Sequence, residues 1–194
     1  MKWGTLNIMP HEIAKKRTEK TKAVLLLHYG GHPCDMDQIY QASKGLTIIE
    51  DSANSVYSSY NGKYCGTLGD IGCFSFDAMK ILVTGDGGMM TFQNDEYYDK
   101  ALSYRYLGLT NKDKSGVDSM KDGKDTWWEI ELAETAGRYV SNDIASSIGL
   151  EQIKKLNGFI ERRKEIWDIY QSELSSVDWL TLPPEPLDGC TSSY

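Results

Sequence analysis

One lysine in the middle of the chain, Lys80, has a setting that suits a reacting amine. Residues 72–76 are apolar and aromatic as in a short β-strand, a polar break then ends at Lys80, and the glycine-rich residues 85–88 favour a tight turn. An amine held at a strand end and partly removed from water can form a Schiff base with a carbonyl compound. The alternative is an ordinary surface lysine on a loop, because short motifs often match by chance.

A carboxylate and a hydroxyl accompany this lysine. Residues 46–50 predict a buried parallel strand with Asp51 at its carboxyl end, and Ser75 precedes Lys80 on another strand. Ligands of open α/β sheets bind at the carboxyl ends of strands. The set matches the needs of pyridoxal phosphate, since Asp51 can pair with the pyridinium nitrogen and Ser75 can donate to the phosphate. Each residue has a structural alternative, such as Asp51 capping the next helix, and it is their joint order that favours the cofactor.

The order of motifs along the chain resembles the DegT/DnrJ/EryC1/StrS family of sugar aminotransferases, which share the aspartate aminotransferase fold. The matching segments are residues 21–24, 28–37, 50–53, 69–76, 80, 85–88 and 143–150. The resemblance implies an α/β fold, the three-layer large domain of a fold type I pyridoxal phosphate enzyme, with a mostly parallel sheet and flanking helices. It also implies a fragment truncated at both ends, because the family's N-terminal segment and C-terminal small domain have no counterpart here.

The same resemblance implies a reaction and its residues. Family members use pyridoxal phosphate to move an amino group from an amino acid, with glutamate the expected donor, to a keto-deoxy sugar nucleotide. Lys80 would hold the cofactor and carry the proton, and the cofactor-binding set is Asp51, Asn54, Ser75 and Lys80. Asn54 replaces the family's glutamine or histidine, so its shorter amide predicts a longer contact with the cofactor's phenolic oxygen. A homodimer is also implied, with Arg138 reaching the neighbouring subunit's phosphate site.

Two other functions stay open. A keto-sugar dehydratase of the same family carries histidine in place of the lysine, so Lys80 argues against it. The other is a non-catalytic fragment that acts only as a dimerisation or binding module, and we expect weak or absent cofactor binding by this chain alone. The predicted division is a partial large domain at 1–137, long interdomain helices at 138–176, and a linker at 177–194 toward a missing small domain.

Composition narrows the possible partners and compartment. The net charge of −7, from 21 basic and 28 acidic residues, argues against nucleic acid and anionic membranes. The apolar runs are too short to cross a bilayer, no signal peptide is found, and the four cysteines lack CxxC spacing. We therefore expect a cytoplasmic protein with reduced thiols and no metal site.

Local end signals predict several further elements. Asn61 and Gly62 form the turn of a hairpin, Asp95 caps a helix that runs to about residue 106, and His28 belongs to a structural turn rather than to the pocket. Residues 110–125 predict a mobile loop, and Trp127 and Trp128 follow it as packing aromatics.

A long helical pattern begins near Asp143 and is expected to bend at Gly158. Its partner, residues 162–174, has an apolar face and a solvated charged face. The apolar face carries Ile166, Ile169 and Tyr170, and the charged residues are Glu161, Arg162, Arg163 and Lys164.

Overall fold

The computed structural model describes residues 4–109 and 132–194. The loop predicted at 110–125 and the two tryptophans that follow it lie outside the described residues. The chain divides into two compact units, Met1–Gln93 with Asp143–Tyr194, and Asn94–Asn142. All four predicted cofactor-binding residues belong to the first unit, while Arg138 belongs to the second. The predicted division at residues 137 and 176 stays a prediction.

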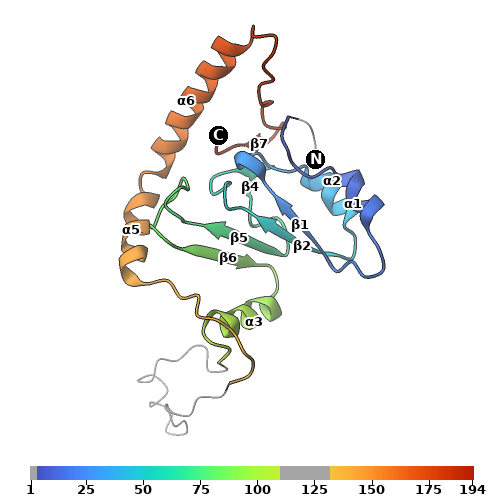
Figure 1. The fold of residues 1–194 in the computed structure, drawn as a ribbon, viewed down its shortest axis with the longest axis vertical. Helices are drawn as coiled ribbons and strands as arrows, with labels where there is room; N and C mark the ends of the chain where they lie inside the picture. Colours follow the sequence, from blue (N-terminus) through green and yellow to red (C-terminus); the bar gives the residue numbers. More distant parts are fainter. Residues whose placement is uncertain (1–3, 110–131) are drawn as a thin grey trace. The chain divides into compact units, whose positions relative to one another are not determined.

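A four-stranded sheet forms the centre of the first unit (Figure 1). Its strands, in spatial order, are β1 (Ala23–Leu27), β2 (Thr47–Asp51), β5 (Ile71–Ser75) and β6 (Gly88–Phe92). The first three are parallel, and β6 runs antiparallel to β5. The predicted α/β fold with a mostly parallel sheet is therefore confirmed.

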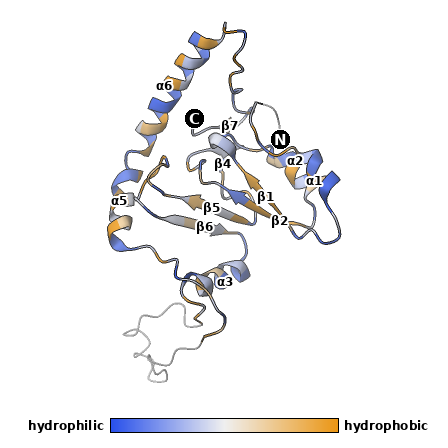
Figure 2. Ribbon diagram, in the orientation of Figure 1, coloured by the Kyte–Doolittle hydropathy of each residue, from blue (hydrophilic) through white to orange (hydrophobic). Residues whose placement is uncertain are grey.

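Helices α1 (Pro10–Lys16) and α2 (Met36–Ala42) contribute to the core on one face of this sheet. Figure 2 shows β1 as a hydrophobic strand, and its burial alternates, with Leu26 buried and Leu25 66% exposed. Leu26 joins Met36 of α2 in the core. Asp35 caps α2 as expected, because its side chain accepts a hydrogen bond from the N–H of Gln38.

The strand register determines which polar groups meet at the sheet edge. Leu27 of β1 lies beside Asp51 of β2, and Asp51 lies beside Cys73 of β5. A short 3₁₀ helix, η1 (Tyr29–Gly31), follows β1. The loops after β1, β2 and β5 therefore begin at the same edge, as parallel strands require.

A small antiparallel sheet contains the chain's last strand. Strands β3 (Ser59–Tyr60) and β4 (Lys63–Tyr64) form the predicted hairpin, whose turn residues Asn61 and Gly62 have φ of 49° and 77°. Positive φ at both positions is typical of a type I′ turn. Strand β7 (Cys190–Thr191) pairs with β3, so the segment predicted as an extended linker returns to the hairpin at its end. Its role as a linker stays a prediction.

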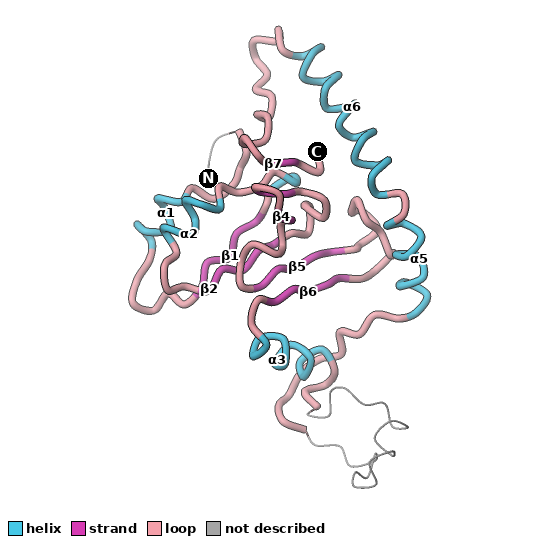
Figure 3. Tube along the Cα trace, turned by 180° about the vertical axis from the view of Figure 1, so that it is seen from behind, coloured by secondary structure: helices cyan, strands magenta, loops and turns pink. Residues whose placement is uncertain are grey.

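Three details of the helices differ from the sequence expectations. Helix α3 (Asp95–Arg105) is capped by Asn94 and not by Asp95, because the Asn94 side chain accepts from the N–H of Glu96. The bend expected at Gly158 lies earlier, between α5 (Asp143–Ile153) and α6 (Leu156–Leu174), as Figure 3 shows from behind. Leu156 and Ile160 are the buried residues of α6, whereas its expected apolar face, Ile166, Ile169 and Tyr170, is exposed.

Two glycine substitutions test this packing with opposite expected signs. A Cβ on Gly72 would lie 2.0 Å from the main-chain oxygen of Gly66 and 2.5 Å from Thr91 Oγ1, so Gly72→Ala should lower the free energy of unfolding by about 1–3 kcal/mol or more. Gly158 lies inside α6 with no atom within 4 Å of such a Cβ, so Gly158→Ala should raise it by about 0.5–1 kcal/mol. Urea unfolding measures both. A Gly72→Ala variant as stable as the parent would contradict the close approach of β5 to Gly66.

Candidate active site

A pocket of about 160 Å³ opens where the loops after β1, β2 and β5 meet α6. It brings together three of the four predicted cofactor-binding residues, Asn54, Ser75 and Lys80. The remaining lining residues are Gly30, Ala53, Val56, Met79, Ile81, Leu82 and Arg163. The carboxyl end of a parallel sheet is the expected location for such a site.

Lys80 is held by a tight turn directly after β5. The N–H of Lys80 donates to the carbonyl oxygen of Asp77 at 3.0 Å, and the Asp77 carboxylate accepts from the N–H of Met79 at 2.9 Å. The Lys80 side chain is half-buried, and its Nζ donates to Oδ1 of Asn54 at 3.1 Å. Lys80 is therefore not an ordinary solvated lysine, because its amine is directed to a neighbouring loop inside the pocket.

Asn54 faces Lys80 through its amide oxygen, so its amide nitrogen is the group available to a ligand's oxygen. Ser75 ends β5, and its hydroxyl accepts from the N–H of Asp77 at 3.4 Å. A serine hydroxyl can also donate a proton while it accepts one. The pocket thus offers an amine, an amide and a hydroxyl within one small volume.

Asp51 lies next to this pocket but does not line it. It is the last residue of β2, and its Oδ1 accepts from the N–H of Ala53, which does line the pocket, at 3.0 Å. Burial, and then the Asp51 carboxylate, raise the pKa of the Cys73 thiol, as expected for partners in the strand register. The predicted pairing of Asp51 with a pyridinium nitrogen stays a prediction.

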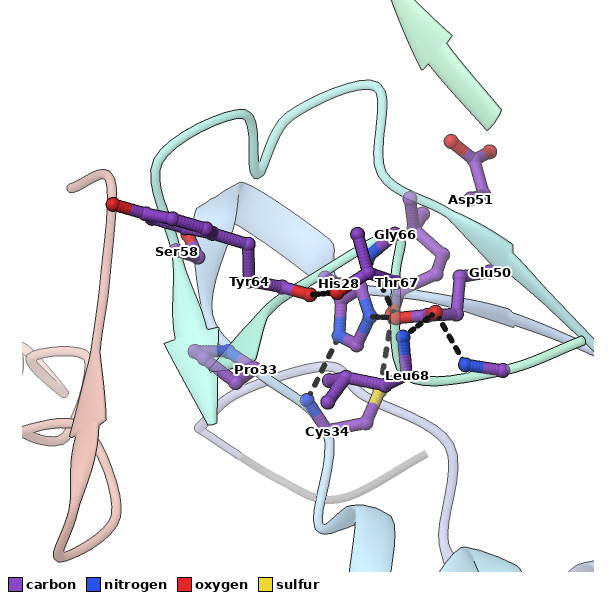
Figure 4. A network of polar contacts seen from close by, with 12 residues as sticks. His28, Pro33, Cys34, Glu50, Asp51, Ser58, Tyr64, Gly66, Thr67 and Leu68 are labelled. Carbon is purple, nitrogen blue, oxygen red and sulfur yellow. Dashed lines mark hydrogen bonds and ion pairs between the residues drawn. The ribbon is translucent and has the colours of Figure 1, made fainter. Parts of the chain in front are cut away.

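A buried polar network lies on the opposite side of β2 from Asp51 (Figure 4). Glu50 and His28 are both fully buried. His28 Nδ1 accepts from the N–H of Cys34 at 3.0 Å, so the ring proton must lie on Nε2, which donates to Glu50 Oε2 at 2.9 Å. His28 thus has a structural role, as expected, and does not line the pocket.

Three main-chain N–H groups also donate hydrogen bonds to the Glu50 carboxylate. Gly66 donates to Oε2 at 2.8 Å, and Leu68 and Gly69 donate to Oε1 at 2.7 and 2.6 Å. Burial alone would raise the pKa of Glu50, but the hydrogen bonds from His28, Gly69 and Gly66 lower it below its usual value. The carboxylate is therefore ionised, and it joins the end of β2 to the turn before β5.

Sequence reasoning did not single out this network. The available signal was a glutamate in an apolar strand one residue before Asp51, which alternation places on the covered face. A charged residue at a buried strand position requires several donors. The identity of the donors follows only from the fold.

Two thiols, those of Cys34 and Cys65, lie close to this network. All four cysteines are free, and burial raises the pKa of Cys34 to about 12. Among the described residues there is no cluster of three His, Cys, Asp or Glu suited to a metal ion, and none of the helices there is long and apolar enough to span a bilayer.

The fold is the one that the sequence motifs predicted, and comparison with known sequences identifies the family. The profile of the DegT/DnrJ/EryC1/StrS aminotransferase family matches residues 1–192. The chain therefore belongs to this family, as its motifs indicated.

Individual relatives give a finer comparison. The chain is 45% identical over 192 residues to the dTDP-4-dehydro-2,3,6-trideoxy-D-glucose 4-aminotransferase of Saccharopolyspora spinosa, covering 98% of this chain and 49% of the relative. The crystal structure of the aminotransferase TlmJ from Streptoalloteichus hindustanus superposes with a TM-score of 0.87 at 44% identity, over 98% of this chain and 49% of that one. The chain spans about half the length of the curated relatives it matches.

A third match differs in its reaction. The E. coli GDP-4-keto-6-deoxy-D-mannose-3-dehydratase, solved with bound hydrated pyridoxal phosphate, has a TM-score of 0.81 at 25% identity over 98% of this chain and 49% of that one. The fold alone therefore does not separate an aminotransferase from a dehydratase, and the pocket residues must decide.

Proposed function

We propose that this chain carries the lysine site of a pyridoxal-phosphate-dependent aminotransferase that acts on a nucleotide-linked keto-deoxy sugar. The observation that carries the proposal is the 3.1 Å contact between Lys80 Nζ and Asn54 Oδ1 in a pocket that Ser75 also lines. Two relatives support the proposal, because one is named as a 4-aminotransferase of a dTDP-linked sugar and the other as an aminotransferase. Lys80, in the place where dehydratases carry histidine, favours amino transfer over dehydration.

The pocket residues suit the cofactor's functional groups. Lys80 supplies an amine that can react with the carbonyl carbon of pyridoxal phosphate. Ser75 supplies a hydroxyl for the cofactor's phosphate, and Asn54 supplies an amide N–H for its phenolic oxygen. Asp51, next to the pocket, supplies a carboxylate for the ring nitrogen. When bound, pyridoxal phosphate supplies an electron sink for negative charge that develops on a substrate carbon.

Lys80 has a second task in this proposal. With the cofactor bound, its Nζ would move a proton from the α-carbon of the amino donor to the cofactor's carbonyl carbon, and in the second half-reaction from that carbon to the carbon of the acceptor sugar. The bond to Asn54 fixes the position of this amine between the two transfers. We propose glutamate as donor and a homodimer as the assembled state, with Arg138 of the second unit as the candidate contact to the neighbouring subunit.

The test is an amino-transfer assay on this chain and on the longest natural chain that contains it. Each is mixed with pyridoxal phosphate, L-glutamate and a dTDP- or GDP-linked 4-keto-6-deoxy sugar, and the product is identified by mass spectrometry. We expect an amino sugar from the longer chain and weak cofactor retention by the 194-residue chain. A deoxygenated product that lacks nitrogen would indicate a dehydratase. Cofactor retention without transfer from any donor would indicate a binding module.

A further inference from the structure

The lining of the Lys80 pocket is positively charged. Of the described residues that line it, Lys80 and Arg163 are cationic and none is acidic. This contrasts with the chain as a whole, whose net charge is −7. A concave site lined by positive charges attracts anionic ligands.

Arg163 differs from its two neighbours in α6. Arg162 pairs with Glu165 at 2.7 Å, and Lys164 pairs with Asp168 at 2.7 Å. Arg163 has no acidic side-chain partner among the described residues, and its bonds go to main-chain oxygens of Ser193, at 2.9 Å from Nε, and of Tyr194. Two of its five N–H donors are thus used to hold the guanidinium, and the others remain for a ligand.

A chain of hydrogen bonds links Arg163 to Lys80. The Ser193 carbonyl accepts from Arg163, and the Ser193 hydroxyl donates to the main-chain oxygen of Asn54 at 2.8 Å. The Asn54 side chain in turn accepts from Lys80 Nζ. The two cations are therefore held in a defined relation to each other through the last residues of the chain.

We propose that Arg163 is a binding residue for an oxyanion, a carboxylate or a phosphate, on the molecule that reacts at Lys80. The inference rests on the proposed function and adds the recognition group to it. A guanidinium fork matches the two oxygens of such a group and stays charged at any working pH. The pocket volume of about 160 Å³ is below the range of about 300–1,000 Å³ that is usual for larger ligands, so it fits the reacting end of a substrate rather than a whole sugar nucleotide.

The test compares Arg163→Gln with Arg162→Gln, which removes a neighbouring exposed cation already paired with Glu165. The first arm measures binding of inorganic phosphate and of acetate to the 194-residue chain by isothermal titration, so it needs neither the cofactor nor Lys80 chemistry. We expect Arg163→Gln to weaken binding of at least one of the two by about tenfold, and Arg162→Gln to leave it unchanged. Equal losses in both variants, or none in either, would overturn the proposal.

The second arm uses the longest natural chain that contains these residues and asks whether the oxyanion belongs to the cofactor or to the substrate. If Arg163 binds the cofactor's phosphate, Arg163→Gln should weaken the binding of pyridoxal phosphate but not the binding of pyridoxal. A substrate role predicts a higher KM for L-glutamate while cofactor affinity is kept. Arg163→Lys, which keeps the charge without the fork, should recover part of the affinity, and a circular dichroism spectrum checks the fold. If the 194-residue chain binds the anions but the longer natural chain shows no visible cofactor band, the proposed function fails while the assignment of Arg163 stands.

Discussion

In the longest natural chain that contains these residues, Lys80→Ala is expected to remove the visible absorbance band of the bound cofactor. It should also lower amino transfer by about 10²–10⁴-fold or more, the range that a positioned acid–base group contributes. The structure gives the reason. Lys80 Nζ is the one amine among the described residues that line the pocket, and Asn54 orients it. No neighbouring side chain there can replace both its nucleophilic nitrogen and its proton transfer.

Lys63→Ala is the matched control for this experiment. Lys63 is an exposed lysine of β4, on the hairpin and away from the pocket lining. Its replacement should leave the absorbance band and the rate unchanged. If Lys80→Ala kept the band, or if both variants lost it to the same extent, the lysine site would have to be sought elsewhere.

The pocket was predictable because its parts follow one rule of α/β sheets. Parallel strands present their carboxyl ends at a single edge, so residues that follow β2 and β5 must lie near one another. The register of Asp51 beside Cys73 fulfils this rule, and Asn54, Ser75 and Lys80 come together as a result. Sequence patterns that locate two strand ends therefore locate a site.

The place of Arg163 in the pocket could not be predicted from the sequence. Helical periodicity identified an apolar stripe at Ile166 and Ile169, but in the described chain both residues are exposed. Arg163 lines the pocket because the chain returns at Ser193 and accepts its hydrogen bond. Contacts between segments so distant in sequence depend on tertiary packing, which no local pattern encodes.

Glu50→Gln is the substitution expected to affect stability most among those considered. The carboxylate of Glu50 accepts four hydrogen bonds in a fully buried site, from His28 and three main-chain N–H groups (Figure 4). A glutamine amide keeps one acceptor oxygen and turns an N–H₂ donor toward groups that are themselves donors. Each buried donor that loses its acceptor in this way costs about 1–3 kcal/mol, so the substitution should lower the free energy of unfolding by at least that amount.

The same carboxylate makes stability depend on acid pH. Because hydrogen bonds lower the folded-state pKa of Glu50, its contribution is complete above the pKa of the unfolded chain and is lost as the pH falls through the folded-state value. The parent protein should therefore lose stability as the pH falls below about 4.3, the ordinary value for glutamate. Glu50→Gln, which has no proton to gain, should lose less over the same interval.

Urea unfolding of the parent, Glu50→Gln and Glu151→Gln, at neutral pH and in acid, measures both effects. Glu151 is exposed and pairs with Lys154 on the surface, so its replacement should leave the free energy of unfolding nearly unchanged. Two results would contradict the assignment of Glu50 as an ionised clamp: a Glu50→Gln variant as stable as Glu151→Gln, or the same acid sensitivity in parent and Glu50→Gln. Either result would mean that Glu50 is protonated in the folded chain, and then the turn from Gly66 to Gly69 would have to be held at the end of β2 by other contacts.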